Sequence, residues 1–320
     1  MRMSDTVVLS VLEFGESERK TLSHCVGMRF SKERYTPFST FKGDFFTDNF
    51  FGEIIDVELY VNGFLIHKGV IDVCEQRLLP TKKLVSISSK GYTFSLGYTE
   101  LAEGIRYGLS LDTLMTPDVT PPFVSCEQSA SLVNYLYIKE HSTLWDAVVN
   151  LCLKGLSCYP YIAYTNTVRF SKPQSPKIIA FDDDAKITAF SSGSNLSNMI
   201  SDLHMRDVNG NYNAYNAQCG YAVERNIERH KHLSFDRHWL SDMNRGLGFK
   251  LDFFSRGREF KKISYKGFNG EDINDCFLSE VSGIETGVLD ISAVEILAGK
   301  NGVITTLTAY SDGFCNVNQP

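Results

Sequence analysis

The chain has 320 residues, of which 43% are hydrophobic and 22% are charged, and these proportions exclude disorder over most of its length. A chain of this size can form two or three domains around at least one large core. Its formal net charge is −6 and its Lys and Arg residues are dispersed, which excludes the basic surface of a sequence-specific nucleic-acid binder.

The first third of the chain is predicted to be β-structure. Its strand-like runs cover residues 6–14, 27–30, 36–41, 56–73 and 84–96. In the fourth of these, two alternating segments meet at Asn62-Gly63, which predicts a type I′ turn because both central positions need a positive φ. Short strands separated by Gly, Pro, Asn and Asp indicate a barrel or sandwich rather than alternating strands and helices.

The middle of the chain adds a small α+β unit. Residues 110–115 predict a capped helical turn, and STLWDAVVNLCLKG at residues 142–155 predicts a helix. Ser142 or Thr143 can cap this helix, with Asp146 completing the capping box. Gly155 stands where a left-handed C-terminal residue is expected. The following YPYIAY, the turn TNT and the run VRF predict a short hairpin.

The last third returns to β-structure after the linker SKPQSPK. Residues 177–195 carry strand character, residues 204–262 are irregular and polar, and residues 290–310 predict a closing hairpin around residues 299–302. The acidic triplet at residues 182–184 is expected to be a turn, because it lacks the alternation of a calcium loop.

One stretch has the composition of a metal site. HKHLSFDRH offers His230, His232, Asp236 and His238, and imidazole with carboxylate suits zinc or non-haem iron. The spacing matches no known zinc or iron motif, so a solvated loop is the favoured interpretation, and a metal-dependent hydrolase stays open as an alternative. No nucleophile elbow and no phosphate-binding glycine loop occurs in the sequence, so we expect no enzyme, no catalytic residue and no cofactor.

A second alternative is a carbohydrate-binding protein that recognises a receptor. Aromatic residues gather around the predicted helix and hairpin: Trp145, Tyr159, Tyr161, Tyr164 and Phe170. At this spacing aromatic side chains are more often core than sugar platform, so we expect them to be buried.

Targeting signals are not apparent in the sequence. Its first residues lack the apolar core of an export signal, and no stretch reaches the roughly 20 apolar residues of a membrane span. Its eight cysteines form no CxxC pair, which favours free thiols in a reducing cytoplasm.

The order of the segments resembles a known family. These segments are VELYVNGFLIHKGVIDVCEQ, KLVSISSKGYTFSLGYTE, STLWDAVVNLCLKGLSCYPYIAYTNTVRF and GVLDISAVEILAGKNGVITTLTAY. Together they are similar to the tail hub proteins of phage baseplates, a family shared with phage-like bacteriocins and with the hub part of the type VI secretion spike. The chain departs from the family pattern at Lys90-Gly91-Tyr92, where an acidic residue is usual, and residues 204–262 do not align.

The resemblance implies a mainly β fold with a smaller α+β part. It implies two tube-like β-barrel domains, residues 1–108 and 178–320, with an α+β domain at 109–177 that contains a helix at 143–154. The second barrel would carry an irregular insertion at about 204–262. The first hairpin would then lie at a subunit interface, with these candidate residues: Val57, Leu59, Val61, Asn62, Gly63 and Phe64.

The resemblance also implies a structural virion protein of the injection machinery. The family forms a homotrimeric ring that adapts the hexameric tail tube to a three-fold spike or tail tip. The implied partners are further copies of the chain, the tail tube or distal tail protein, the spike or tail-tip protein, the tape-measure protein and, in a contractile tail, the baseplate wedge proteins. The protein would be assembled in the bacterial host cytoplasm and located in the tail baseplate. Three copies of a chain with net charge −6 would carry about −18, which predicts an acidic lumen that repels DNA.

Overall fold

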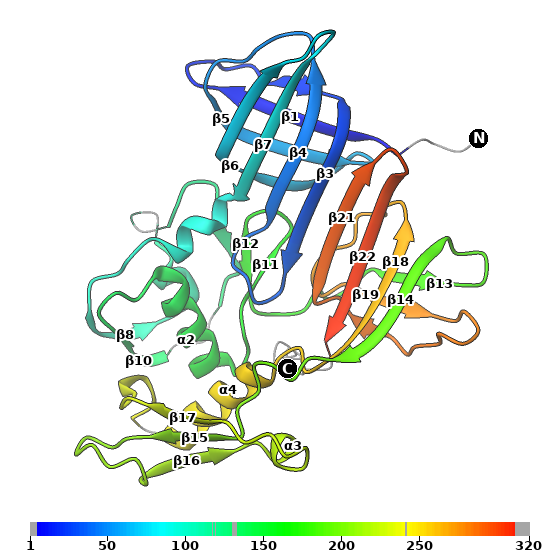
Figure 1. Ribbon diagram of the computed structural model, residues 1–320. Coiled ribbons are helices and arrows are strands. Elements are labelled where there is room, and N and C mark those ends of the chain that lie inside the picture. The colour runs from blue at the N-terminus through cyan, green and yellow to red at the C-terminus, as the bar shows by residue number, and fades with distance from the viewer. Residues whose placement is uncertain (1–4, 117, 119, 130–132, 241, 311–320) are drawn as a thin grey trace.

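The computed structural model describes residues 5–116, 118, 120–129, 133–240 and 242–310. These residues are mainly β with a smaller helical part, as the sequence predicts. Two β modules lie next to each other and an α+β unit lies below them in the view of Figure 1. No helix among the described residues is long and apolar enough to cross a membrane.

The first β module contains the strands of the first third of the chain. Its elements are β1 (Val7–Glu13), β2 (Lys20–Leu22), β3 (His24–Glu33), β4 (Thr40–Thr47), β5 (Ile54–Val61), β6 (Phe64–Leu78), β7 (Lys83–Gly91) and the 3-10 helix η1 (Tyr92–Gly97). The turn between β5 and β6 is the predicted one, since Asn62 and Gly63 have φ of 51° and 82°.

Two predicted strands of this module have other bounds than expected. The run at residues 36–41 becomes strand at Thr40, because Pro37 lacks the N–H that a ladder needs. The run at residues 84–96 ends as a strand at Gly91 and continues as η1, where the Ser95 hydroxyl donates to the Tyr92 carbonyl at 2.6 Å. Such a local side-chain bond competes with extended backbone.

The second β module is built from both sides of a long insertion. Its strands are β13 (Ile178–Phe181), β14 (Ile187–Ser194), β18 (Glu259–Lys266), β19 (Cys276–Ser279), β20 (Leu289–Asp290), β21 (Ala293–Gly299) and β22 (Gly302–Tyr310). β21 and β22 form the predicted closing hairpin, and the acidic triplet lies in the predicted turn between β13 and β14.

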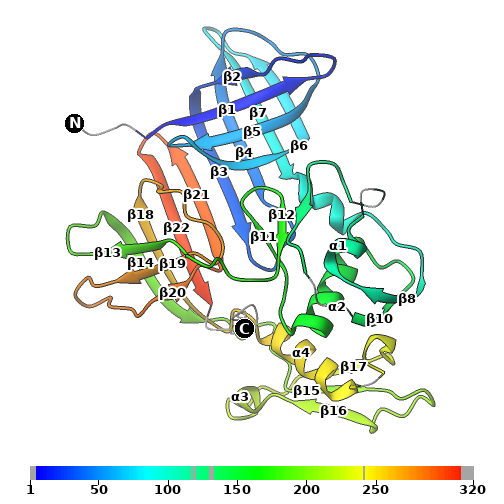
Figure 2. The ribbon, with the colours of Figure 1, turned by 180° about the vertical axis from the view of Figure 1, so that it is seen from behind.

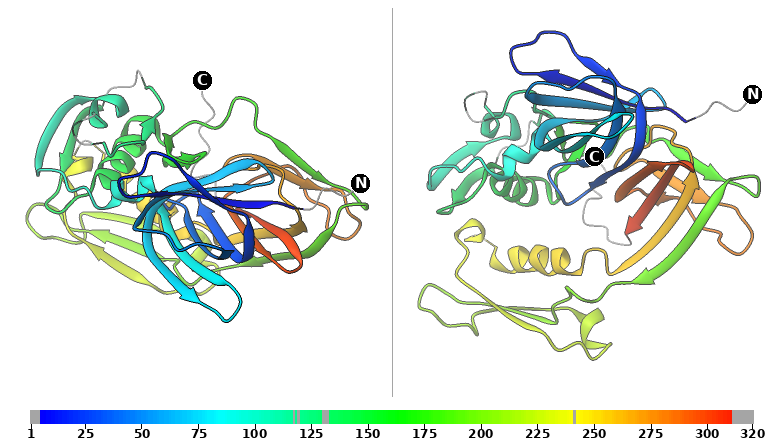
Figure 3. Two further views of the ribbon diagram at one scale, coloured as in Figure 1. Left: turned by 90° about the horizontal axis from the view of Figure 1, so that it is seen from above. Right: turned by 45° about the horizontal axis from the view of Figure 1, so that its top comes forward.

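One antiparallel sheet of eleven strands runs through both modules, in the order β14-β18-β22-β21-β3-β4-β7-β6-β5-β1-β2. The modules are joined where β3 pairs with β21. The apolar side chains of β1 and β5 share one core with those of β3, β4 and β7, so the sheet curls back over that core (Figure 3). In the second module β13 and β19 close the same core from the other end.

The α+β unit contains the predicted helix and hairpin. Its elements are β8 (Gly104–Leu109), α1 (Leu111–Leu114), β9 (Ser125–Cys126), β10 (Val133–Ile138), α2 (Leu144–Leu156), β11 (Tyr161–Ala163) and β12 (Thr167–Arg169). Thr143 caps α2 and forms the predicted capping box with Asp146. The left-handed C-terminal residue is Ser157, not Gly155. Gly155 is required for another reason, since a Cβ there would lie 2.8 Å from Val133.

The described residues of the insertion between β14 and β18, 195–240 and 242–258, complete this unit. The insertion contains β15 (Asp202–Met205), β16 (Tyr215–Gln218), α3 (Gly220–Val223), β17 (His230–Leu233), the 3-10 helix η2 (Arg237–Trp239) and α4 (Met243–Ser255). Leu203, Trp239 and Leu247 are buried in one core with α2. The expectation of an irregular polar segment is therefore wrong, because its apolar residues share one core with α2, which is distant in sequence, and local patterning does not reveal this. Figure 2 shows α4 of the insertion next to α2.

Candidate assembly interface

The junction between the two modules is a strand-to-strand seam. β21 and β3 pair antiparallel from Ala293 opposite Glu33 to Ala298 opposite Met28. The Arg29 Nε atom lies 2.7 Å from Glu295 Oε1 across the seam, but both side chains are solvated and such pairs contribute about 0–1 kcal/mol. The seam therefore depends mainly on backbone hydrogen bonds and on the apolar side chains of its buried face.

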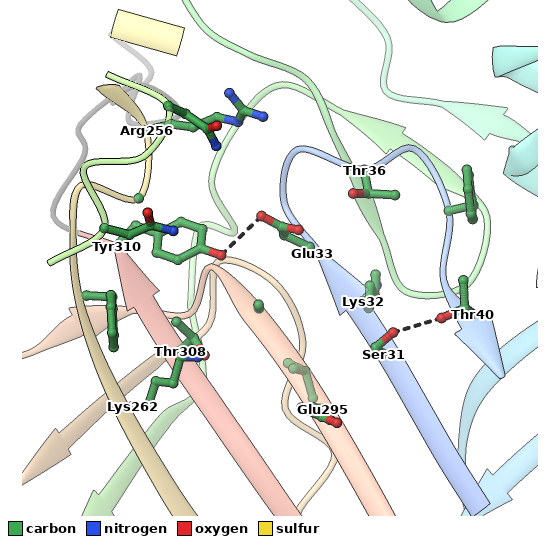
Figure 4. Close-up of a pocket in the computed structure, with 17 residues that line it drawn as sticks. Ser31, Lys32, Glu33, Thr36, Thr40, Arg256, Lys262, Glu295, Thr308 and Tyr310 are labelled. Atoms are coloured by element: carbon green, nitrogen blue, oxygen red, sulfur yellow. Dashed lines mark hydrogen bonds between the residues drawn. The ribbon is translucent and has the colours of Figure 1, made fainter. Parts of the chain in front are cut away.

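A polar cleft of about 390 Å³ lies over the seam, as Figure 4 shows. The Tyr310 hydroxyl donates to Glu33 Oε1 at 3.1 Å, and the Ser31 and Thr40 hydroxyls lie 2.7 Å apart. The lining carries side chains of both charges, among them Lys262 and Glu295. Its lining also includes Phe38 and Phe260, so polar and apolar side chains share the cleft.

Lys32 connects three parts of the chain. It lies on β3, its side chain is almost fully buried, and its ammonium group donates to the Tyr164 carbonyl at 2.5 Å and to the Asp272 carboxylate. The same carboxylate accepts from the Tyr164 N–H at 2.5 Å. The first module, the α+β unit and the second module are thus fixed at one point. Sequence reasoning missed this contact because Lys32 and Asp272 lie far apart in the chain and belong to no motif.

The predicted interface residues on β5 lie inside the chain. Val57, Leu59 and Val61 are 0% exposed, and β5 is paired on both sides, with β1 and β6. Their side chains cannot contact a neighbouring molecule in this fold. The apolar alternation of β5 reflects burial in the chain's own core.

The turn residues of the same hairpin contact the second β module. The Asn62 side-chain amide donates to the Phe268 carbonyl at 3.1 Å. The Phe64 ring lies edge-on to the Phe268 ring, with centroids 5.9 Å apart, and packs against Gly270, where a Cβ would lie 2.6 Å from it. Asn62 and Phe64 of the predicted interface thus contact the second module of the same chain, while Gly63 and about half of the Phe64 side chain stay exposed.

Several strands of the described residues pair along one side only, among them the three-residue β2 at one end of the large sheet, and two of these edges in the large sheet are long. β5 pairs with β6 only as far as Val70, so residues 71–78 of β6 pair along one side only, with β7. At the other end of the sheet β14 pairs only with β18 and forms the outer margin of the second module (Figures 1 and 3). On β6, Val73 and Leu78 are 60% and 73% exposed. Open edges of this length invite pairing with another strand.

The predicted metal residues do not converge. His230 and His232 project to one exposed face of β17, and the His204 ring of β15 stacks between them at centroid distances of 5.8 and 5.0 Å. Asp236 and His238 are buried elsewhere. Among the described residues no group of three His, Cys, Asp or Glu side chains is arranged to hold a metal ion.

Asp236 and His238 show that the solvated-loop interpretation is wrong for half of this stretch. Burial favours a raised pKa for Asp236, but the ammonium groups of Lys250 and Lys139, at 2.9 and 3.5 Å, hold its pKa at about 2. Burial lowers the pKa of His238 to about 4. Asp236 also caps η2 by accepting from the His238 N–H at 3.1 Å, so its role in the fold is structural.

The aromatic residues of the carbohydrate alternative are mostly core, as expected. Trp145, Tyr159, Tyr161 and Phe170 are buried, and Tyr159 stacks on Phe253 of α4 with centroids 5.4 Å apart. Tyr164 is exposed by itself at the tip of the hairpin. Trp145 and Tyr159 also line a pocket of about 320 Å³, together with Phe253 of α4.

The chain matches no model of a known family and no curated protein sequence. It is similar in structure to the tail protein from Neisseria meningitidis MC58, with 12% identity, 98% of each chain covered and a TM-score of 0.72. It is also similar to the 43 kDa tail protein of prophage MuSo2 from Shewanella oneidensis, with 13% identity, 96% of this chain and 98% of that chain covered, and a TM-score of 0.70.

A further similar structure is the E. coli c3393 protein, described as a component of the type VI secretion system that resembles the T4 bacteriophage tail proteins gp27 and gp5. Its identity is 8%, with 98% of this chain and 79% of that chain covered, and its TM-score is 0.56. At these identities the similarity establishes the fold. The resemblance to tail hub proteins that the sequence indicates is confirmed at that level.

Proposed function

We propose that this chain, which has the fold of phage tail proteins, is a structural tail protein that forms a homotrimeric ring. In this proposal the ring joins a hexameric tail tube to a three-fold spike or tail tip. The neighbours in fold are named tail proteins and a secretion-system component, and these names support a structural role in an injection machine. The proposal assigns no catalytic step to the chain.

The observation that carries the proposal is an internal repetition of topology. Across the sheet, the first module presents β3, β4, β7 and β6, and the second presents β14, β18, β22 and β21. If the strands of each set are numbered 1 to 4 in their order across the sheet, the chain forms strand 1 first, then strand 2, then strand 4 and then strand 3, and it does so in both sets. Each chain therefore contributes two equivalent four-strand units, and three chains contribute the six units that match a six-fold tube.

The arrangement of the seam supports ring closure. Within the chain the fourth strand of one unit, β21, pairs with the first strand of the other, β3. The two open edges are the remaining fourth strand, β6, and the remaining first strand, β14. A head-to-tail contact that joins β6 of one chain to β14 of the next repeats the internal contact and removes both edges.

The faces of this sheet suggest which one lines the channel. One face is covered by the core and by β1, β5, β13 and β19, whereas the other carries side chains such as Arg29, Lys42 and Lys262 together with Asp44 and Glu295. We place the uncovered face on the inside of the ring. The covered face carries a second layer of strands, and the outside of a ring has more space for that layer than the inside. That wall would mix both charges, which does not support the acidic lumen expected from net charge.

The proposed location is the tail baseplate of a virion or phage-like particle, with tube, spike and tape-measure proteins as partners. The test is the mass of the purified full chain over a range of concentrations, followed by electron microscopy of the particles. We expect three chain masses and a ring with three-fold symmetry and six similar lobes. A chain that stays monomeric at every concentration, or a ring of another symmetry, would overturn the proposal.

The same preparation tests the two alternatives. A glycan array should show no binding, and elemental analysis should detect no stoichiometric metal. Strong binding of one glycan class by a monomeric protein would favour the receptor-recognition alternative instead.

A further inference from the structure

We infer that the seam between neighbouring chains has a defined register, in which residues 71–78 of β6 pair antiparallel with β14 and Cys74 lies opposite Ser194 of the next chain. This inference rests on the proposed ring and names the residues that close it. It follows from superimposing the hydrogen-bond registers of the two modules.

The first strands of the two units can be aligned by a shared irregularity. In β3 the pairing with β4 shifts between Cys25 and Gly27, and in β14 the pairing with β18 shifts between Ile187 and Ala189. Both shifts lie near the start of the strand, and a β-bulge is a specific structural feature rather than a random defect. Aligning them places Gly27 with Ala189 and therefore Lys32 with Ser194.

The pairings carry this alignment across the sheet. Gly27 pairs with Asp44 and Ala189 pairs with Ser264, so Asp44 corresponds to Ser264. Asp44 pairs with Ser86 and Ser264 pairs with Thr306, so these third-strand residues correspond as well. The fourth-strand partners of Ser86 and Thr306 are Glu75 and Glu295, and Cys74 therefore corresponds to Val294.

Burial provides an independent check of this correspondence. A shift by one residue would set core positions of one module against surface positions of the other. Instead, buried side chains correspond: Phe45 with Tyr265, Ile87 with Leu307, and Val85 with Thr305. The alignment derived from the bulges is thus consistent with the side of the sheet that each module buries.

The internal seam then predicts the external one. Val294 lies opposite Lys32, so its counterpart Cys74 should lie opposite Ser194, the counterpart of Lys32. Ala298 lies opposite Met28 in the internal seam. Leu78 is the counterpart of Ala298 and Phe190 is the counterpart of Met28, so Leu78 should lie opposite Phe190 of the next chain. Leu78 is 73% exposed and Phe190 is partly exposed in the single chain, and pairing them would remove two apolar side chains from water.

A notch beside the open edge is the space this strand would enter. It has a volume of about 470 Å³ and lies between residues 71–76 of β6 and residues 52–55. Ile54, Ile71 and Cys74 line it, all on or beside the edge that β5 leaves unpaired. A second copy of β14 is the occupant that fits, because the chain already fills the equivalent edge of β21 with its own β3.

A single substitution tests the register. Opposite residues of an antiparallel pair have Cα atoms about 4.5–5.5 Å apart, which is within the range that a disulfide bridges. Cys74 is a free thiol, so Ser194→Cys in the full chain should give covalent dimers and trimers on oxidation with diamide, reversed by dithiothreitol. The unsubstituted chain and Cys74→Ser/Ser194→Cys should give single chains on the same non-reducing gel.

Register and ring can be judged separately. Ser192→Cys lies on the same face of β14, two residues away, and should cross-link several-fold less than Ser194→Cys. Leu78→Cys with Phe190→Cys in a Cys74→Ser background should cross-link as a second predicted pair. If native mass measurement gives a trimer but Ser192→Cys cross-links better, or neither predicted pair does, the register is wrong and the ring stands. If all variants and the unsubstituted chain are monomeric, both proposals fail.

Discussion

At the scale of single residues, Lys32 is the side chain that most directly holds the parts of the molecule together. Its ammonium group bonds Asp272 of the second module and the Tyr164 carbonyl of the α+β unit. Removing a buried charge leaves its partners without the hydrogen bonds that offset their own desolvation. The geometry of the whole chain is therefore sensitive to one residue that belongs to no motif.

We predict that Lys32→Met lowers the free energy of unfolding by about 2 kcal/mol, less than for a fully buried pair because Asp272 is partly solvated. Arg29→Met is the matched control on the same strand. It removes a positive charge from the solvated pair with Glu295 and should cost about 0–1 kcal/mol. Urea unfolding measures both. Equal losses in the two variants would show that Lys32 is not a special contact.

His67 gives the fold a dependence on pH. Its ring is fully buried, Nδ1 lies 2.8 Å from the Ser39 hydroxyl and Nε2 lies 2.9 Å from the Ser89 hydroxyl. Burial lowers the pKa of His67 from 6.5 to about 3. The unfolded chain therefore takes up a proton below pH 6.5 that the folded chain does not, so acidification favours unfolding.

We predict that stability falls as pH drops from 6.5 towards 4, with His67 contributing up to about 1.4 kcal/mol per pH unit. His238, whose pKa burial lowers to about 4, acts in the same direction. His67→Gln keeps polar groups between the two serines but cannot titrate. Denaturation at several pH values should give a smaller slope for this variant than for the unsubstituted chain, and parallel slopes would contradict the assignment.

At the scale of elements, α4 shows how the insertion is attached to the rest of the molecule. The helix packs on η2 through Gly246, where a Cβ would lie 2.4 Å from the Trp239 ring. Gly248 lies two residues further along the same helix, and there is open space where its Cβ would be. The Trp239 ring therefore leaves no space for a side chain at Gly246, whereas a side chain would fit at Gly248.

We predict opposite effects of the same substitution at these two positions. Gly246→Ala should destabilise by about 1–3 kcal/mol, because the added methyl group pushes α4 away from Trp239. Gly248→Ala should stabilise by up to about 1 kcal/mol, since alanine favours helix and meets no neighbour. Thermal unfolding of both variants measures the difference. The same sign in both would mean that α4 does not pack on Trp239 as described.

At the scale of the whole molecule, the proposed ring treats the two β modules of one chain as neighbouring units of a cylinder. Residues 71–78 of β6 and the outer side of β14 pair along one side only, whereas β21 and β3 are paired with each other inside the chain. In a single copy these two long edges are therefore left open. Natural proteins commonly cover or charge such edges, and residues 71–78 carry Asp72, Glu75 and Arg77 as well as the exposed apolar Val73 and Leu78.

We predict that Val73→Lys/Leu78→Lys keeps the chain folded but weakens the ring. Both side chains are exposed in the single chain, whereas burial of two apolar side chains at each seam contributes roughly 2 kcal/mol, or about 30-fold in association. Tyr107→Lys is the control, because Tyr107 is equally exposed on β8, away from both edges. At a concentration where the unsubstituted chain is trimeric, native mass measurement should show single chains for the edge variant and trimers for Tyr107→Lys. A trimer of unchanged affinity in that variant would exclude β6 from the seam.

The sequence by itself determined the local elements and the resemblance to a family. Asn62-Gly63 required positive φ and formed the predicted turn, Thr143 and Asp146 formed the predicted capping box, and residues 290–310 formed the predicted hairpin. Each of these features depends on residues that are close together in the chain, so propensity and patterning decide them.

Only the tertiary structure decided which parts contact one another. The pairing of β3 with β21, the contacts of Lys32 and the burial of His238 join segments that are distant in sequence, and no local pattern records such a pairing. The resemblance implied that Val57, Leu59 and Val61 lie at a subunit interface, whereas in the fold they are buried in the chain's own core. Alternation along a strand reports that one face is buried, but not which part of the molecule buries it. The two long open edges on which the proposed ring depends are defined by which strands are neighbours in the sheet, and only the tertiary structure shows this.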